Sequence, residues 1–237
     1  MPLPSLGPLC RKTLAVFRHF LWPAVCPCCG ALGELACPSC LDALATHLGP
    51  RCSACGGAYP CFPHSAPPLW GPVPYGGPAR ELVHRLKFRR ERALGALMGS
   101  SLGRCLPPPE GAALLVPVPL HRGSSRGYNQ SEEIARGLGR EWSLPVVDAL
   151  QWTQDWDPQS RRVKASRRDI PLEALRWEGP PRGGVVLVDD VCTTGTTLDR
   201  CSRAARRGRS SVVAWVAWSL SEGGIAHATR GLPGEEI

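Results

Sequence analysis

The 237-residue chain is poor in lysine, with 3 Lys against 25 Arg, and aromatic residues make up only 6% of it. It contains no apolar stretch of the roughly 18 residues that a membrane-spanning helix requires. Basic residues such as Arg11 and Arg18 interrupt the N-terminal stretch 1–25, which therefore does not resemble a signal peptide. These absences predict a cytoplasmic protein without membrane insertion.

Two nucleotide-binding signatures are also missing. The chain has neither the Gly-Lys-Ser/Thr of a Walker A loop nor a Gly-x-Gly-x-x-Gly fingerprint, which argues against a P-loop or dinucleotide-binding protein. The formal net charge of +8 permits a polyanionic partner. A biased genome composition explains the preference for Arg over Lys equally well, so the charge alone assigns no partner.

Cysteine, in contrast, is abundant: the chain has 12, and eight of them fall between Cys26 and Cys61. In a cytoplasmic chain, where thiols stay reduced, clustered cysteines indicate a metal rather than disulfides. The segment holds three Cys-x-x-Cys pairs, and a Gly follows the first and the third, where it relieves the tight backbone of a metal knuckle. We therefore expect a small module that folds around structural zinc.

The spacing of these pairs predicts two zinc sites. The first has four cysteine ligands: Cys26, Cys29, Cys37 and Cys40. The second has three cysteines and one histidine: Cys52, Cys55, Cys61 and His64. Cys28 is then a bystander, although it can exchange roles with Cys29. Two alternatives stay open: a single ribbon that pairs Cys26/Cys29 with Cys52/Cys55, and redox chemistry at a Cys-x-x-Cys pair.

The most informative segment is an apolar run that ends in two carboxylates and a hydroxyl-rich turn. The run Val185–Val188 is typical of a strand buried on both faces of a parallel sheet. Asp189 and Asp190 follow at its carboxyl end, where open α/β sheets bind ligands. The turn Thr193–Thr197 then opens a helix to about Arg207, and the unpaired N–H groups of a helix N-terminus bind phosphate. Carboxylates beside a phosphate cradle suit a sugar phosphate, because they accept hydrogen bonds from ribose hydroxyls.

A second loop of this kind follows a buried strand expected at 112–118. It contains His121, Arg122 and Arg126. The planar fork of Arg binds phosphate oxygens, so the loop is placed to receive a diphosphate.

The remaining pattern predicts an α/β architecture, a parallel sheet with helices on both faces. The expected strands lie near 112–118, 145–149, 184–190 and 211–218. The expected helices are an amphipathic one over 79–98 that breaks near 88–92, and one over 132–140 that is capped by Asn129 or Ser131. The Gly- and Pro-rich stretch Gly71–Gly77 is predicted to be a linker.

These motifs together resemble one family, the ComF family, also called the ComF/GntX-type phosphoribosyltransferases. Residues 188–197 resemble the phosphoribosyl-pyrophosphate signature of type I phosphoribosyltransferases. Pro117-Val-Pro-Leu…Arg-Gly-Tyr-Asn-Gln130 is similar to the family's "VPVPL…RGFNQ" block, with Tyr128 in place of the commoner Phe. Leu86-Lys-Phe88, and Phe20-Leu-Trp-Pro23 followed by Cys26-x-x-Cys29, match as well, in the family's order along essentially the whole chain.

The resemblance implies a type I phosphoribosyltransferase fold at 70–237, preceded by a double zinc ribbon module at 1–66. It implies that Asp189 and Asp190 hold the ribose hydroxyls of phosphoribosyl pyrophosphate. The implied 5′-phosphate cradle is Thr193, Thr194, Gly195, Thr196 and Thr197. The implied diphosphate loop is Leu120, His121 and Arg122, with Mg²⁺ bridging diphosphate and ribose oxygens. The polar segment 159–169 lies where the family has a mobile loop over the site.

Two functions follow as expectations. The first is transfer of the phosphoribosyl group to an acceptor such as a nucleobase, with release of pyrophosphate. The alternative is a non-catalytic regulatory protein that keeps the sugar-phosphate site and binds single-stranded DNA or a DNA-processing protein, because ComF proteins are associated with DNA uptake in competence. Arg clusters at 89–92, 161–168 and 203–209 are compatible with the alternative. Turnover separates the two.

Overall fold

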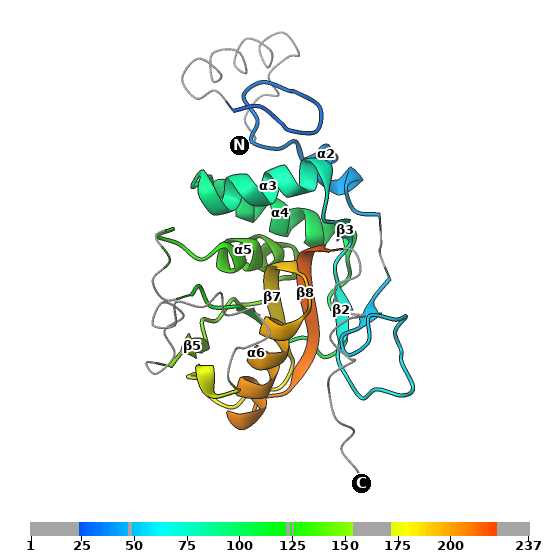
Figure 1. The fold of residues 1–237 in the computed structure, drawn as a ribbon, viewed down its shortest axis with the longest axis vertical. Coiled ribbons are helices and arrows are strands. Elements are labelled where there is room, and N and C mark those ends of the chain that lie inside the picture. Colours follow the sequence, from blue (N-terminus) through cyan, green and yellow to red (C-terminus); the bar gives the residue numbers. More distant parts are fainter. Residues whose placement is uncertain (1–23, 47–48, 122–123, 125, 154–171, 222–237) are drawn as a thin grey trace, which may run out of the picture.

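The structure is a computed structural model, and it describes residues 24–46, 49–121, 124, 126–153 and 172–221. Among these residues, the core is a six-stranded, mostly parallel sheet with helices on both faces (Figure 1). The central strands are β7 (Val185–Cys192) and β8 (Val212–Leu220). The strands that pair parallel with them are β4 (Leu114–Pro117) on β7, and β2 (Pro68–Trp70) and β3 (Val73–Pro74) on β8. At the edge, β1 (Arg51–Cys52) pairs antiparallel with β2.

The central strands are almost continuously apolar because both faces of the sheet are covered. Three helices pack on one face: α3 (Gly77–Phe88), α4 (Arg92–Cys105) and α5 (Gln130–Trp142). The other face carries α6 (Thr196–Arg207) and a ribbon of β5 (Leu150–Trp152) and β6 (Leu175–Trp177), which the 3₁₀ turn η2 (Leu172–Ala174) precedes. Along β7, Val186 and Val188 lie in the first core, whereas Val185 and Leu187 lie in the second. Burial of both sets holds β7 at the centre of the molecule.

Glycines allow α4 and α5 to pack backbone against backbone. A Cβ atom on Gly99 of α4 would lie 1.9 Å from the carbonyl oxygen of Ile134. A Cβ atom on Gly137 of α5 would lie 2.1 Å from the carbonyl oxygen of Ala96. Backbone atoms cannot yield as a flexible side chain can, so both positions require glycine. This contact sets the position of α5, whose first turn reaches the carboxyl end of β7.

Most elements predicted from the sequence are confirmed. The strands at 112–118, 184–190 and 211–218 correspond to β4, β7 and β8. The expected break near 88–92 separates α3 from α4, with Arg90 at φ +57° inside it. Asn129 caps α5, because its Oδ1 accepts the backbone N–H of Ser131 at 3.1 Å. No helix in the described ranges is long and apolar enough to span a membrane.

Two predictions about the chain path were wrong. The expected strand at 145–149 makes a single parallel bridge, Val146 to Leu115, before the chain turns into β5. Pro145 has no N–H to extend that pairing. The expected linker Gly71–Gly77 contains β3 instead, and a Cβ on Gly71 would lie 2.2 Å from the Leu220 side chain. Glycine at that position therefore serves close packing on β8.

The cysteine-rich segment is attached to the core at both of its ends. The short helix α2 (Pro38–Ala43) lies against α4, where Arg104 makes two hydrogen bonds to Asp42, at 2.7 and 3.1 Å. Arg85 of α3 donates to the carbonyl oxygen of Val25 at 2.7 Å. On the other side, β1 and β2 join the segment to the main sheet.

The contact between α4 and α5 yields the first prediction. Gly99→Ala should lower the free energy of unfolding by about 1–3 kcal/mol, because the added methyl group overpacks the interface. Urea denaturation followed by circular dichroism measures the change. Gly49→Ala is the matched control, since a Cβ there has no heavy atom within 4 Å. Equal stability of the two variants would contradict the backbone contact.

Candidate phosphoribosyl site and cysteine clusters

The strand order reverses between β4 and β7. The two strands run parallel, but α5, which follows β4, and α6, which follows β7, cover opposite faces of the sheet. The chain leaves β4 toward the bridge at Val146 and leaves β7 toward β8 on the other side. Open α/β sheets bind ligands at such a reversal, beyond the carboxyl ends of the strands. The two loops singled out in the sequence, at 120–122 and 189–197, both begin there.

Two helices hold the carboxylates at the end of β7. The hydroxyl of Ser131, in the first turn of α5, donates to Asp189 Oδ1 at 2.9 Å. The backbone N–H of Asp190 donates to the same oxygen at 2.8 Å. Lys87 Nζ, near the end of α3, lies 2.8 Å from Asp190 Oδ1, and the two side chains are only 16% and 9% exposed. The acidic pair is therefore oriented by partners rather than left to rotate in solvent.

The environment of Asp189 raises its pKa toward neutrality. Burial, and then the neighbouring Asp190 carboxylate, raise the pKa of Asp189 to about 7, against opposing contributions from Lys87, the Asp190 N–H and Ser131. A carboxyl group with a shifted pKa in a cleft is typical of a functional site, although ion-pair networks also shift pKa values. Here the carboxyl group borders an open pocket, which supports the functional reading.

That pocket is open to solvent and lies at the N-terminus of α6. It is lined by Asp189 and by residues 191–198, which include all five residues of the expected phosphate cradle. Gly195 caps the helix at φ +75°, a conformation that favours glycine, and no side chain caps the helix. The hydroxyls of Thr194 and Thr196 lie 2.9 Å apart at the same turn. Hydroxyls and uncapped N–H groups together form a surface suited to an anion.

The thiol of Cys192 also lines the pocket. Burial raises its pKa to about 12, with the Asp189 carboxylate acting in the same direction. A thiol with so high a pKa stays protonated at neutral pH, and only the thiolate is nucleophilic. Cys192 therefore serves as a small apolar side chain in the wall of the pocket.

The loop after β4 is described in part. Leu120 follows the strand, and the ring of His121 stacks on Trp152 with centroids 4.2 Å apart. Trp152 Nε1 donates to the carbonyl oxygen of Pro119 at 3.2 Å, so β5 supports this loop. Arg122 and the polar segment 159–169 lie outside the described residues, as do residues 20–23.

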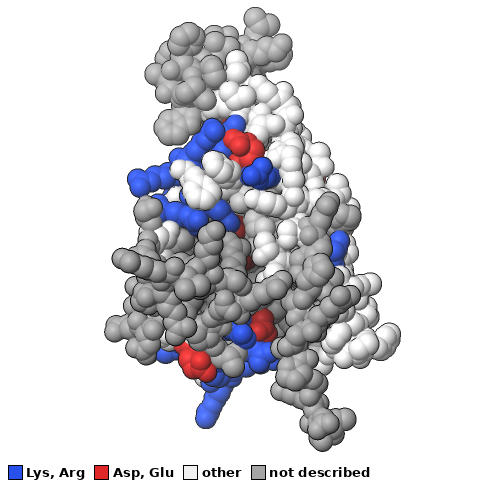
Figure 2. All heavy atoms as spheres, viewed as in Figure 1, with Lys and Arg blue, Asp and Glu red and all other residues white. Residues whose placement is uncertain are grey.

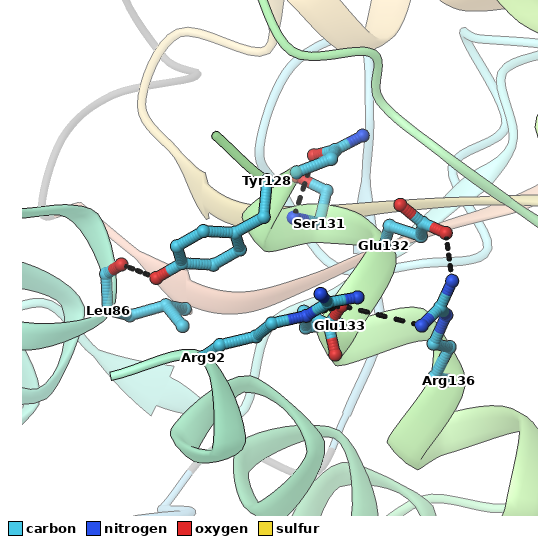
Figure 3. Close-up of polar contacts among 8 residues, drawn as sticks. Leu86, Arg92, Tyr128, Ser131, Glu132, Glu133 and Arg136 are labelled. Atoms are coloured by element: carbon cyan, nitrogen blue, oxygen red, sulfur yellow. Dashed lines mark hydrogen bonds and ion pairs between the residues drawn. The ribbon is translucent and has the colours of Figure 1, made fainter. Parts of the chain in front are cut away.

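Figure 3 shows how the first turn of α5 is tied to α3 and α4. Arg92 Nε donates to Glu133 Oε1 at 2.6 Å, which pairs a carboxylate that is almost fully buried. The hydroxyl of Tyr128 donates to the carbonyl oxygen of Leu86. Burial raises the pKa of the Tyr128 hydroxyl, which keeps it a donor at neutral pH. These contacts join the end of α3 to the loop that carries Tyr128.

Two site residues were missed as such in the sequence, Lys87 and Ser131. Lys87 lies in the Leu86-Lys-Phe88 match to the family, where the sequence assigns it no role, although it is the only lysine among the described residues. Ser131 was considered only as a helix cap. Lys87 lies 103 positions before its partner Asp190 in the sequence, and Ser131 lies 58 positions before its partner Asp189. Such separations explain why local pattern did not reveal them.

The structure brings together both predicted sets of zinc ligands. In the first, the sulfurs of Cys26, Cys29, Cys37 and Cys40 lie within 4.8 Å of one another. In the second, the same holds for Cys52, Cys55, Cys61 and His64. A tetrahedral zinc with Zn–S bonds of about 2.3 Å separates two sulfurs by about 3.8 Å. The sulfurs of Cys29 and Cys37 are 3.7 Å apart, as are those of Cys55 and Cys61, so each set fits one ion.

The positions of the ligand atoms support this grouping over the alternative single ribbon, although the two knuckles are alike in backbone. The two glycine-containing knuckles share one pattern: Gly30 N–H donates to Cys26 O, and Gly56 N–H donates to Cys52 O, at 2.9 and 2.8 Å. Gly30 and Gly56 have φ of +73° and +75°, as expected where a tight knuckle requires glycine. Each knuckle faces its own second pair, so Cys26/Cys29 and Cys52/Cys55 do not share a set.

Clustered thiols cannot all ionise without a cation. The hydrogen bond to Cys29, and then burial, raise the pKa of Cys40 to about 12. Although burial opposes its ionisation, backbone N–H groups such as that of Cys37 lower the pKa of Cys26 to about 6. A bound Zn²⁺ would supply the missing positive charge.

These features define an α/β protein with an acidic pair at the switch point of its sheet and two cysteine-rich clusters compatible with a zinc ribbon. No family model matches the chain. It is 31% identical over 234 residues to DNA utilization protein YhgH of Escherichia coli (strain K12), an alignment that covers 91% of this chain and 97% of that protein. Its identity with DNA utilization protein YhgH of Salmonella typhimurium is 30%, with the same coverage. Competence protein F of Haemophilus influenzae is 30% identical over 159 residues, or 60% of this chain and 68% of that protein.

The chain therefore belongs to the ComF/GntX family, the family of DNA utilization protein YhgH. The comparisons thus confirm the family to which the sequence motifs pointed.

The cysteine clusters yield the second prediction. The purified protein should contain two zinc ions per chain by atomic absorption, and Cys40→Ser should reduce the content to one. Removing zinc with a chelator should also lower the melting temperature, because metal binding supplies folding energy to so small a module. Cys28→Ser is the matched control and should keep both ions, since Cys28 belongs to neither set. Retention of two ions in Cys40→Ser would contradict the assignment.

Proposed function

We propose that this protein binds phosphoribosyl pyrophosphate with Mg²⁺ and transfers the phosphoribosyl group to a nitrogen acceptor. One observation carries the proposal: the Asp189 carboxyl group and an uncapped helix N-terminus border one pocket at the switch point of a parallel sheet, and Asp190 adjoins Asp189 in β7. The helix N-terminus suits the 5′-phosphate, because its N–H groups and dipole favour an anion. The carboxylates suit the ribose, whose hydroxyls are hydrogen-bond donors.

The residues around the pocket account for the chemistry of transfer. Asp189 and Asp190 hold the ribose hydroxyls while the turn at 193–197 holds the 5′-phosphate. The acceptor nitrogen forms a bond to the anomeric carbon as the bond from that carbon to the diphosphate oxygen breaks, and diphosphate leaves with the electron pair. Positive charge develops on the ribose ring, and the nearby carboxylates stabilise it. Holding the sugar at both ends lowers the entropic part of the barrier.

Lys87 orients Asp190 for this task. Its ammonium group lies 2.8 Å from the carboxylate in a nearly buried ion pair. Removing one partner of such a pair leaves an uncompensated charge, which is costly. We infer that Lys87 fixes the orientation of the Asp190 carboxylate, so that its oxygens face the ribose hydroxyls as acceptors.

Two metals accompany the proposal. Mg²⁺ prefers oxygen ligands, and the carboxyl oxygens of Asp189 and Asp190 would hold it beside the bound substrate. Bound there, it would neutralise the leaving diphosphate. Zn²⁺ at the two cysteine clusters would be structural, because protein atoms fill all four positions of each set.

Calorimetry with phosphoribosyl pyrophosphate and Mg²⁺ tests the proposal. The parent protein should bind, and Asp190→Asn should reduce the affinity by at least ten-fold, about 1.4 kcal/mol. The change keeps the size of the side chain but removes the charge that pairs with Lys87. Glu110→Gln is the matched control, because Glu110 precedes β4 and lies at the opposite end of that strand from the site. Failure of the folded, zinc-loaded parent to bind would overturn the proposal.

A second function, binding of single-stranded DNA, has its own support. The relatives are named for DNA utilization and competence. Lys and Arg side chains gather over the end of α3 (Figure 2), where the Arg89 side chain is 56% exposed and the Arg92 side chain is 54% exposed. Phosphate groups bind to such patches through charge, so the affinity falls as salt rises. In this reading the sugar-phosphate pocket serves regulation rather than turnover.

Fluorescence anisotropy with a labelled oligothymidylate checks this second function. Binding should weaken with rising salt, and Arg89→Ala should lower the slope of log K against log salt by about 0.7, the value for one contact to a single strand. Arg176→Ala is the control, because its side chain is 69% exposed but lies on β6, away from the patch. An identical slope in parent and Arg89→Ala would exclude Arg89 from the interface.

A further inference from the structure

The last turn of α3 is fixed to the candidate site at consecutive residues. The carbonyl oxygen of Leu86 accepts the Tyr128 hydroxyl, and Lys87 pairs with Asp190. The next residue, Phe88, ends the same helix, so its backbone is fixed in the turn that carries Lys87, whereas its side chain is 63% exposed. An exposed apolar ring needs no explanation by itself. What needs an explanation is that Phe88 is exposed on a fixed turn, next in sequence to the site residue Lys87.

Two side chains that can carry positive charge, Arg126 and His84, lie beside the Phe88 ring. The guanidinium carbon of Arg126 lies 5.4 Å from the centre of the Phe88 ring, and the ring of His84 lies 4.9 Å from it on the same helix. Arg126 is itself held by Gln130, whose Oε1 accepts from its Nη1 at 3.3 Å. Gln130 precedes Ser131, which bonds Asp189. Phe88 and Arg126 are thus each attached to an element that contacts the carboxylates, Phe88 to the last turn of α3 and Arg126 to the first turn of α5.

We propose that Phe88 and Arg126 form the subsite for the acceptor, and that the acceptor is a nucleobase whose ring stacks on Phe88. The proposal rests on the proposed function and specifies the substrate class for that site. Aromatic rings and guanidinium planes both stack on heterocyclic bases, whereas an aliphatic amine gains little from either. The other strongly exposed phenylalanine of the described residues, Phe62, is 99% exposed and lies between the zinc ligands Cys61 and His64. Phe88 has the additional property that its neighbour touches Asp190.

Ligands with and without a base test the subsite. Ribose 5-phosphate carries only the sugar phosphate, whereas adenosine and uridine 5′-monophosphates add a base at the anomeric carbon. In calorimetry, the parent should bind both nucleotides more tightly than ribose 5-phosphate. Phe88→Ala should weaken both nucleotides by about five-fold or more, the loss expected for one stacked base, and leave ribose 5-phosphate unchanged. Phe88→Trp should restore the nucleotide affinity, and Phe62→Ala, the matched control, should have no effect.

The outcomes separate this inference from the proposed function. If the parent binds neither ribose 5-phosphate nor phosphoribosyl pyrophosphate, the proposed function fails, and the subsite fails with it. If ribose 5-phosphate binds but the nucleotides bind no more tightly, or Phe88→Ala leaves their affinity unchanged, only the subsite is overturned. A competition arm identifies the source of the base. Displacement of adenosine 5′-monophosphate by oligothymidylate in the parent, but not in Phe88→Ala, indicates a base within a strand, and displacement by free adenine alone indicates a free base.

Discussion

The parallel pairing of β4 with β7 is the constraint on which the candidate site depends. Because the two strands run in the same direction, their carboxyl ends lie together, and the helices that follow them leave to opposite faces of the sheet, which is the arrangement at which open α/β sheets bind ligands. The pairing needs β7 to be apolar on both faces. Its last residues can then carry Asp189 and Asp190 at the rim, where the next turn opens α6.

The same constraint explains why α3 and α5 contribute to this site, although the turn at 193–197 leads into α6 and not into either of them. Close packing of α4 on α5 through Gly99 and Gly137 sets the height of Ser131 beside Asp189. The turn at the end of α3 brings Lys87 to the other carboxylate. Cysteine clusters at the edge of the molecule brace this arrangement, because one contacts α3 and α4 and the other joins the sheet through β1 and β2. Zinc at the clusters would therefore stabilise the frame rather than the chemistry.

Local pattern was sufficient for features whose physics is local. Two Cys-x-x-Cys-Gly knuckles, the apolar run of β7 and the glycine turn before α6 each carry their own geometry in a few residues. The linker at 71–77 was misread because Gly71 looks like a flexible hinge, whereas it serves contact with Leu220. The strand at 145–149 was misread because β-branched residues favour pairing, but pairing also needs a neighbour within reach.

The sequence by itself determined the class of the fold, the family, the sets of candidate zinc ligands and the residues of the turn at 189–197. These depend on short spacings and on residue chemistry. Only the tertiary structure decided which groups meet the carboxylates: Lys87 at Asp190 and Ser131 at Asp189. Each of these contacts joins a helix to β7 across a long stretch of sequence, so it arises from packing of the helices on the sheet, which no local periodicity encodes.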